Sequence, residues 1–337
     1  MRSVVLPAAA KVVPGPEHAH GTLRSRMASF TELRDQVFEC YHQRLYIEAL
    51  ELIENFEPTD RSQDEDLHFW RMCLQSRLGE TDQALATFAE ALDGQHWWSE
   101  TMLRDSDLDP LRELPQWKTL LKRSLDLHAK EPALEPTPLV VPPSEQGAGD
   151  GWALVVLHGA GARPEVEAEH WKAATQDGWT IVVPQSTQRL SAAGRYGWHD
   201  LERARADVMM QLEKTGWLSE GSLVVGGFSQ GGGLAAHLVC TGTVDAQGLV
   251  VLGPSFGDWG VPKVTAGGPV RSWILLGDEE HPRIAGAVEE LSEVLRITGW
   301  PVEIEPLEGV GHSHPSDFSD RLLRALGWVA SEPTVRE

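Results

Sequence analysis

Residues 222–233 read SLVVGGFSQGGG and are followed by the apolar run of residues 234–240. A short β-branched run, a glycine turn with one serine and a stretch of small residues predict a strand, a sharp turn and a helix. Gly227, Ser229 and Gly231 form the pattern G-x-S-x-G, in which the glycines let strand and helix approach closely. The pattern therefore predicts a strained turn that exposes the Ser229 hydroxyl at the end of a strand.

Around this stretch, apolar runs alternate with helical patterns. The expected strands are residues 152–157, 180–183, 222–225, 248–252, 272–276 and 302–304, and the expected helices are residues 165–174, 200–214, 284–297 and 317–329. Continuous apolar runs separated by helices indicate a parallel sheet that is covered on both faces. The predicted fold class is α/β, with a doubly wound, mostly parallel sheet preceded by a small all-α domain.

Three loops carry polar side chains at the carboxyl ends of predicted strands, where active sites gather in such sheets. They are LHGAGA at residues 157–162, GDEEHP at residues 277–282 and GVGHSHP at residues 309–315. With Ser229 they supply an acid and a histidine in the chain order serine, acid, histidine.

The serine hydroxyl is a poor nucleophile, so a histidine must accept its proton and a carboxylate must hold the imidazole. His312 and His314 are the candidates for the histidine. The Gly-x-Gly-His spacing favours His312, because glycine lets the loop turn the ring inward.

Four short segments, LHG at residues 157–159, YGWHD at 196–200, GFSQGG at 227–232 and GH at 311–312, resemble the α/β-hydrolases. Within that superfamily, residues 152–330 are similar to the carboxylesterase, lysophospholipase and acyl-protein thioesterase group. The resemblance implies a serine hydrolase that cleaves a carboxylic ester or thioester through an acyl-enzyme. It also implies that the backbone N–H groups of Ala160 and Gln230 bind the oxyanion.

The resemblance does not fix the acid. Relatives place it three residues after the glycine that ends the strand, which selects Glu280, but they usually carry aspartate there. Asp278 is therefore the rival, and Asp258 is a third candidate.

Other residues near these loops are expected to shape the site. His158 and Gly159 are expected to shape the oxyanion loop, and Trp198 to line a pocket or shape a loop. No metal or cofactor is expected, because no recognised metal-ligand spacing, P-loop or dinucleotide motif is present.

The amino-terminal part shows helical spacing in residues 32–56 and 67–92, with a further amphipathic stretch at residues 111–127. The small and apolar positions resemble a degenerate tetratricopeptide repeat. Arg44 stands where the turn glycine of the first repeat is expected. These positions are Gly79, Ala84, Phe88 and Ala91, and 35 residues earlier Ala49, Ile53 and Phe56. Such helices either bind a protein or peptide partner or form an ordinary helical hairpin.

Composition shifts divide the chain into five segments. We expect a disordered leader at residues 1–26, a helical domain at 27–131, a proline-rich linker at 132–150, an α/β-hydrolase domain at 151–331 and a tail at 332–337. Residues 138–141 within the linker are a candidate edge strand. Either Met1 or Met27 is the expected start.

The formal net charge of −21 argues against nucleic acid as a partner. Three cysteines and the lack of a long apolar run predict a cytoplasmic protein without a membrane span. The expected partner is a small ester or thioester substrate. Two alternatives stay open: an adaptor with an idle hydrolase-like domain, and a peptidase that uses the same triad.

Overall fold

The computed structural model describes residues 29–144, 151–220 and 222–331. The predicted leader and tail, and residues 145–150 of the predicted linker, lie outside the described residues. The chain divides into two compact units between Glu57 and Pro58. The second unit therefore contains helices of the amino-terminal part as well as the whole sheet.

The described part of the first unit, residues 29–57, contains two helices, α1 (Phe30–His42) and α2 (Tyr46–Glu54), which contact each other. Ser29 caps α1 by accepting a hydrogen bond from the Glu32 N–H at 3.2 Å. The turn between the helices holds Arg44 at a φ of 62°, so the residue that stands where the sequence led us to expect glycine adopts the conformation of a turn glycine.

The second unit begins with a helical part. Its elements are α3 (Arg61–Arg77), α4 (Thr81–Asp93), η1 (Met102–Arg104), η2 (Ser106–Leu108), α5 (Asp109–Arg112) and α6 (Pro115–His128). Gly79 turns the chain between α3 and α4 with a φ of 79°. In the apolar core of this part, Trp98 contacts Phe69 and Phe88, and Phe88 also contacts Trp117.

The rest of the unit is a seven-stranded sheet with the order β1-β3-β2-β4-β5-β6-β7. The strands are β1 (Leu139–Val141), β2 (Trp152–Leu157), β3 (Thr180–Val183), β4 (Ser222–Phe228), β5 (Gly248–Leu252), β6 (Arg271–Gly277) and β7 (Val302–Leu307). All neighbouring pairs are parallel except β1 and β3. The predicted doubly wound, mostly parallel α/β fold is confirmed.

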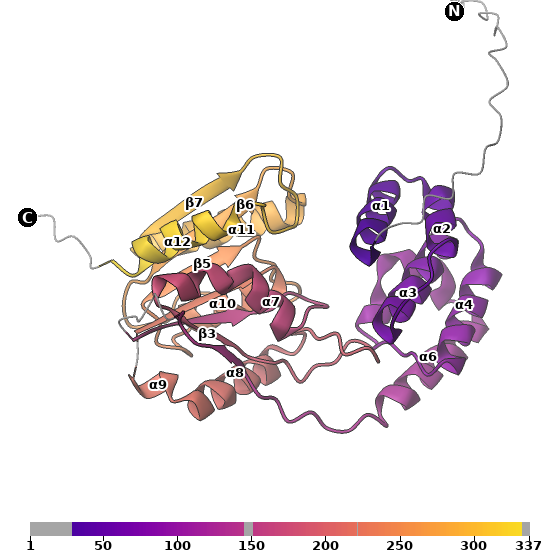
Figure 1. Cartoon of the computed structure of the whole chain (residues 1–337), viewed down its shortest axis with the longest axis horizontal. Helices are drawn as coiled ribbons and strands as arrows, with labels where there is room; N and C mark the ends of the chain where they lie inside the picture. The colour runs from indigo at the N-terminus through magenta and orange to yellow at the C-terminus, as the bar shows by residue number, and fades with distance from the viewer. Residues whose placement is uncertain (1–28, 145–150, 221, 332–337) are drawn as a thin grey trace, which may run out of the picture. The chain divides into compact units, whose positions relative to one another are not determined.

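Helices cover both faces of this sheet (Figure 1). One face packs on α8 (Leu201–Thr215), α10 (Gln230–Cys240) and α11 (Pro282–Ile297), and the other on α7 (Pro164–Trp171), η3 (Lys172–Asp177) and α12 (Phe318–Val329). A short helix, α9 (Trp217–Glu220), follows α8. In β2, Val155 belongs to the first core and Val156 to the second, because successive side chains of a strand point to opposite faces.

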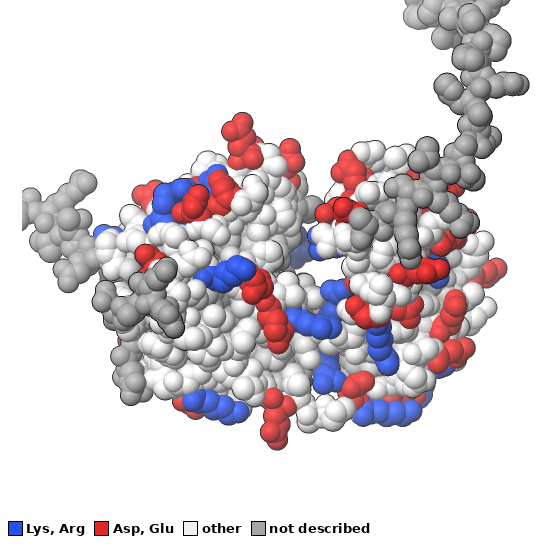
Figure 2. Space-filling view, in the orientation of Figure 1, with Lys and Arg blue, Asp and Glu red and all other residues white. Residues whose placement is uncertain are grey.

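None of the helices in the described residues combines the length and the apolar character needed to cross a membrane. On the face that Figure 2 shows, acidic and basic side chains are interspersed.

Candidate active site

Ser229 occupies the turn between β4 and α10, with a φ of 54° and a ψ of −123°. A non-glycine residue in this region is strained, and its surroundings must hold it there. The Ser229 N–H donates to the Leu252 carbonyl at 3.0 Å, and the Ser229 carbonyl accepts from the N–H groups of Gly233 and Ser255 at 3.0 and 2.9 Å. These three hydrogen bonds fix the serine between β5 and α10.

The glycines on either side of Ser229 are required by close backbone contacts. A Cβ atom on Gly227 would lie 2.6 Å from the Leu157 carbonyl oxygen, and one on Gly231 would lie even closer to the same oxygen. Because real Cβ atoms do not approach so closely, any side chain at either position would push β4 and α10 away from β2.

A chain of hydrogen bonds joins three side chains from three strand ends. The Ser229 Oγ lies 2.7 Å from His312 Nε2, and His312 Nδ1 lies 2.7 Å from Glu280 Oε2. The second oxygen of Glu280 accepts from the His281 N–H at 2.8 Å. With Nδ1–H donating to the carboxylate, Nε2 is left as the acceptor for the serine proton.

The three hydrogen-bonded side chains differ in their exposure to solvent. The Glu280 side chain is 2% exposed, whereas His312 is 36% exposed. The carboxylate is therefore shielded from water, while the imidazole faces solvent from which a substrate can enter.

Of the rival acids, Glu280 is the one that contacts His312. Asp278 is exposed and accepts from the Gly309 N–H at 2.8 Å, so it fixes the loop that leads to His312. Asp258 is exposed on the loop after β5.

Of the two histidines, the structure places only His312 against Ser229. The His314 ring stacks on His170 with a centroid distance of 3.9 Å, and its Nε2 lies 3.5 Å from a carboxylate oxygen of Glu167. His314 therefore belongs to the packing around α7.

The loop expected to bind the oxyanion lies beside the serine turn. A Cβ atom on Gly159 would lie 3.7 Å from Ser229 Cβ and 3.3 Å from the Phe228 ring. Gln230 is the first residue of α10, and helix starts leave backbone N–H groups unpaired. Within the described residues, neither the Ala160 nor the Gln230 N–H donates to a backbone carbonyl.

His158 and Trp198 support this loop from within the core. The Trp198 indole N–H donates to the His158 carbonyl at 2.9 Å, and the two rings stack at 4.7 Å. Burial lowers the pKa of the His158 imidazole, so this ring is neutral near neutral pH. Trp198 is fully buried, and its backbone N–H donates to Gln230 Oε1 at 2.8 Å. Its place fits loop shaping better than a pocket wall.

Gly253, which sequence reasoning missed, lies beneath the acid and the histidine. Its φ is 48°, and a Cβ atom there would lie 3.0 Å from Glu280 Oε2 and 3.4 Å from His312 Nδ1. Only glycine leaves room for that hydrogen bond. The sequence does carry a signal for it, because Gly253 directly follows the apolar run of residues 248–252, at the carboxyl end of a predicted strand.

A hollow of about 300 Å³ lies between the loop after β5 and the start of α11. Ser255, whose N–H bonds the Ser229 carbonyl, lines it together with Phe256, Val261, Arg283 and Ile284. Ser255 links the hollow to the serine turn, while Ser229, His312 and Glu280 are not among the residues that line it.

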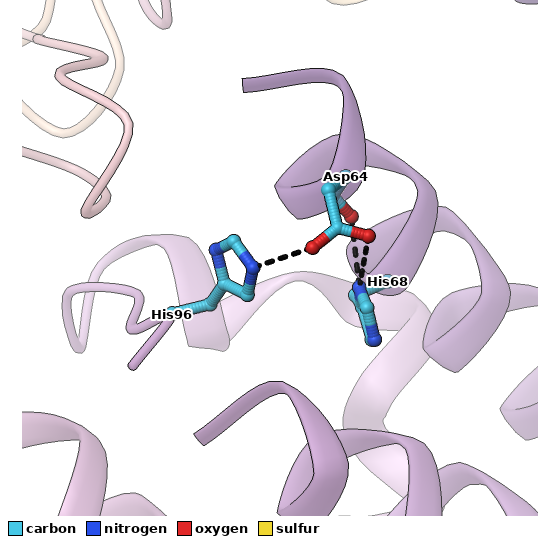
Figure 3. A group of neighbouring side chains, drawn as sticks. All are labelled: Asp64, His68 and His96. Carbon is cyan, nitrogen blue, oxygen red and sulfur yellow. Dashed lines mark hydrogen bonds and ion pairs between the residues drawn. The ribbon is translucent and has the colours of Figure 1, made fainter. Parts of the chain in front are cut away.

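Two side-chain groups in the described residues have the donors for a metal ion. One is Asp64, His68 and His96 (Figure 3), and the other is Cys73, Asp105 and Asp107. In the first group, His96 Nε2 already bonds the Asp64 carboxylate at 2.7 Å, and His68 Nδ1 bonds the Asp64 carbonyl at 2.8 Å.

In the second group, burial raises the pKa of the Cys73 thiol well above its usual value. The protonated thiol is a weak metal ligand. Neither group touches the serine, histidine and acid.

A family model described as "A/B hydrolase-like, N-terminal domain" matches residues 29–130. No curated protein matches the chain. The tetratricopeptide resemblance of the amino-terminal helices is not tested by this match and stays a prediction.

Among solved structures, an uncharacterized protein from Bacillus cereus is 17% identical, with a TM-score of 0.46, over 90% of this chain and 99% of that one. An α/β serine hydrolase without a lid from Xanthomonas campestris is 18% identical, with a TM-score of 0.45, over 60% and 93%. A monoacylglycerol lipase from Paleococcus ferrophilus is 14% identical, with a TM-score of 0.45, over 58% and 98%. At these levels of similarity, function has to be argued from the geometry of the site.

Proposed function

We propose that this protein is a serine hydrolase that cleaves a carboxylic ester or thioester through an acyl-enzyme. The observation that supports this proposal is the hydrogen-bonded chain from Ser229 through His312 to Glu280, with both distances at 2.7 Å. Nucleophile, base and orienting carboxylate are thus within hydrogen-bond reach of one another, as acyl transfer requires.

In the proposed reaction, Ser229 Oγ attacks the substrate carbonyl carbon while His312 Nε2 takes the hydroxyl proton. The Nδ1–H stays on the imidazole and donates to Glu280, whose buried negative charge stabilises the imidazolium. His312 then returns the proton to the departing alcohol or thiol, which leaves an acyl group on Ser229. A water molecule repeats the same steps and releases the carboxylic acid.

The negative charge on the carbonyl oxygen needs donors that are already in place. The Ala160 and Gln230 N–H groups are proposed for this role, and one such donor is typically worth about 3 kcal/mol of barrier.

The hollow beside Ser255 is proposed to receive the acyl or leaving group, because its volume of about 300 Å³ suits a small ligand.

A fluorophosphonate probe and an activated p-nitrophenyl ester test this proposal directly. Wild-type protein should gain one adduct at Ser229 and hydrolyse the ester, while Ser229→Ala should lose both reactions. Ser313→Ala is a matched control, because Ser313 is exposed beside His312 but outside the hydrogen-bonded chain. Mass spectrometry locates the adduct, and absorbance measures the turnover.

The alternatives give different results in the same experiment. Folded wild-type protein that takes no adduct and shows no turnover would contradict the proposal and favour an adaptor. A matched set of an ester, a thioester and an anilide then defines the reaction. Cleavage of the anilide as fast as the ester would indicate a peptidase instead.

A further inference from the structure

A loop between β3 and α8, residues 187–196, connects the helical part with the sheet part; we call it the bridging loop. On the helical side, the Ser99 N–H donates to the Leu190 carbonyl at 2.7 Å and the Ala192 N–H donates to the Trp97 carbonyl at 3.0 Å. Ala192 also packs against the apolar core of the helical part. The bridging loop is therefore fixed by residues more than 90 positions earlier in the chain.

Two buried carboxylates on α3 hold the same loop. Glu65 is 1% exposed and accepts from the Ala193 N–H at 3.0 Å, and Asp66 is 5% exposed and pairs with the Arg195 guanidinium. Carboxylates this far from water are tolerated only when they are paired or hydrogen-bonded. Their partners here lie in the sheet part.

Arg195 also connects Asp66 to the oxyanion loop, which we define as residues 158–163. Its Nη1 donates to the Gly161 carbonyl at 3.1 Å, while its Nη2 pairs with Asp66. The Gly161 N–H in turn donates to the Tyr196 carbonyl at 2.7 Å. Both backbone groups of Gly161, the residue after Ala160, are thus held by the end of the bridging loop.

The far end of the oxyanion loop is tied in the same way. The Arg163 guanidinium donates to the carbonyl of Gly194 at 3.0 Å and also to the carbonyl of Ala193. With Gly161 and Arg163 both fixed, the Ala160 backbone between Gly159 and Gly161 has little freedom to rotate.

The start of α3 is itself braced by His96 (Figure 3). His96 Nε2 lies 2.7 Å from Asp64 Oδ2, and its Nδ1 lies 3.5 Å from Glu65 Oε2. The neighbouring carboxylates of Glu65 and Asp64 raise the pKa of this imidazole against the effect of its burial. His96 therefore stabilises the helical turn of α3 that carries Glu65 and Asp66.

We propose that Asp66 and Arg195 are positioning residues, through which the helical part sets the direction of the Ala160 N–H in the oxyanion loop. The proposal rests on the serine hydrolase function proposed above. It predicts that the helical part contributes to the rate of the chemical step without touching the substrate.

The test compares Asp66→Asn, Arg195→Ala, Arg195→Lys and the double variant Asp66→Asn/Arg195→Ala in the full chain. An oxyanion donor acts mainly in the transition state, so kcat per active site should fall about 10- to 100-fold while KM stays unchanged. Active sites are counted by fluorophosphonate titration, which removes the effect of any misfolded fraction. The double variant should be no slower than Arg195→Ala, because both changes break one connection.

Two controls isolate positioning from a general loss of stability. Asp93→Asn breaks an exposed ion pair with Arg123 in the same helical part and should leave kcat unchanged. Guanidinium chloride at millimolar concentration should restore part of the kcat of Arg195→Ala, because the Arg195 side chain is 29% exposed and its site can be reached from solvent.

The outcomes separate the two proposals. Absence of Ser229-dependent turnover in the wild type would overturn the proposed function. If the wild type turns over and the Asp66 and Arg195 variants keep kcat per titrated site within about twofold, or change only KM, the positioning role is overturned.

Discussion

Three described residues other than glycine have a positive φ, Arg44, Gln95 and Ser229, and two of them, Ser229 at 54° and Arg44 at 62°, differ in their surroundings. Ser229 is locked by three backbone hydrogen bonds and by glycines that admit no side chain. Arg44 is exposed between α1 and α2, and its N–H donates to the Tyr41 carbonyl at 3.0 Å. A positive φ alone therefore does not mark a functional residue, whereas a positive φ in rigid surroundings points to one.

The largest expected effect tests whether the strained serine works with Glu280. Glu280→Gln keeps the shape of the side chain but removes the charge that orients His312, so kcat should fall by about 10⁴-fold. Asp278→Asn is the matched control two residues away and should change kcat less than about threefold, because Asp278 only fixes the Gly309 loop. A larger loss in Asp278→Asn than in Glu280→Gln would contradict the assignment of the acid. Ester turnover per titrated site gives both numbers.

The second prediction breaks the rigid frame around Ser229. Gly231→Ala would drive a methyl group into the Leu157 carbonyl, so the free energy of unfolding should fall by about 3 kcal/mol or more. Gly286→Ala in α11 is the control, because its added methyl group meets nothing within 4 Å. In a helix this change should stabilise the protein by about 0.5–1 kcal/mol. Urea denaturation compares the two, and equal stabilities would refute the close-contact explanation.

The third prediction concerns the buried charge of Asp66. Burial raises the pKa of this carboxyl from 3.8 to about 6, with smaller contributions from Glu65 and Asp60, against the lowering effect of Arg195. An acid whose pKa rises on folding stabilises the folded state most at low pH, and that stability is lost as pH increases from about 4 to 6.

Asn at position 66 cannot titrate. The free energy of unfolding of Asp66→Asn relative to wild type should therefore increase by up to about 3 kcal/mol between pH 3.5 and pH 7. Urea denaturation at several pH values measures this difference. A difference that does not change with pH would show that Asp66 has an ordinary pKa.

The smallest expected change in stability concerns the two compared turns themselves. Arg44→Gly and Ser229→Gly both relieve a positive φ, and each should stabilise the protein by at most about 1 kcal/mol after the entropy cost of glycine. Ester turnover should be unchanged in Arg44→Gly and abolished in Ser229→Gly. Destabilisation of Arg44→Gly would show that the arginine makes contacts that outweigh its strain. Thermal unfolding and ester turnover provide the readouts.

Much of the fold could be predicted from the sequence, because the strand signals are local. The runs at residues 152–157 and 248–252 coincide with β2 and β5, and the G-x-S-x-G pattern places Ser229 at a strand end. The acid could not be decided in this way. Asp278 and Glu280 lie two residues apart, and the turn after β6 determines which of them faces His312.

Contacts between distant parts of the chain were also beyond sequence reasoning. Asp66 and Arg195 are 129 positions apart, and neither lies in a pattern that points to the other. The proline-rich residues 132–143 mark a change in composition, yet α3, α4 and α6 form one compact unit with the sheet. Hydrogen bonds such as that between Ser99 and Leu190 make this connection, and a local pattern cannot show it.

The dependence of the bridging loop on α3 limits how this protein could be shortened or recombined. A chain that began at the linker would keep Ser229, His312 and Glu280 but would leave Arg195 without its carboxylate and Ala192 without its apolar neighbours. Exchange of the helical segment with that of a relative would therefore require Glu65, Asp66 and Trp97 to travel together with the loop that they hold.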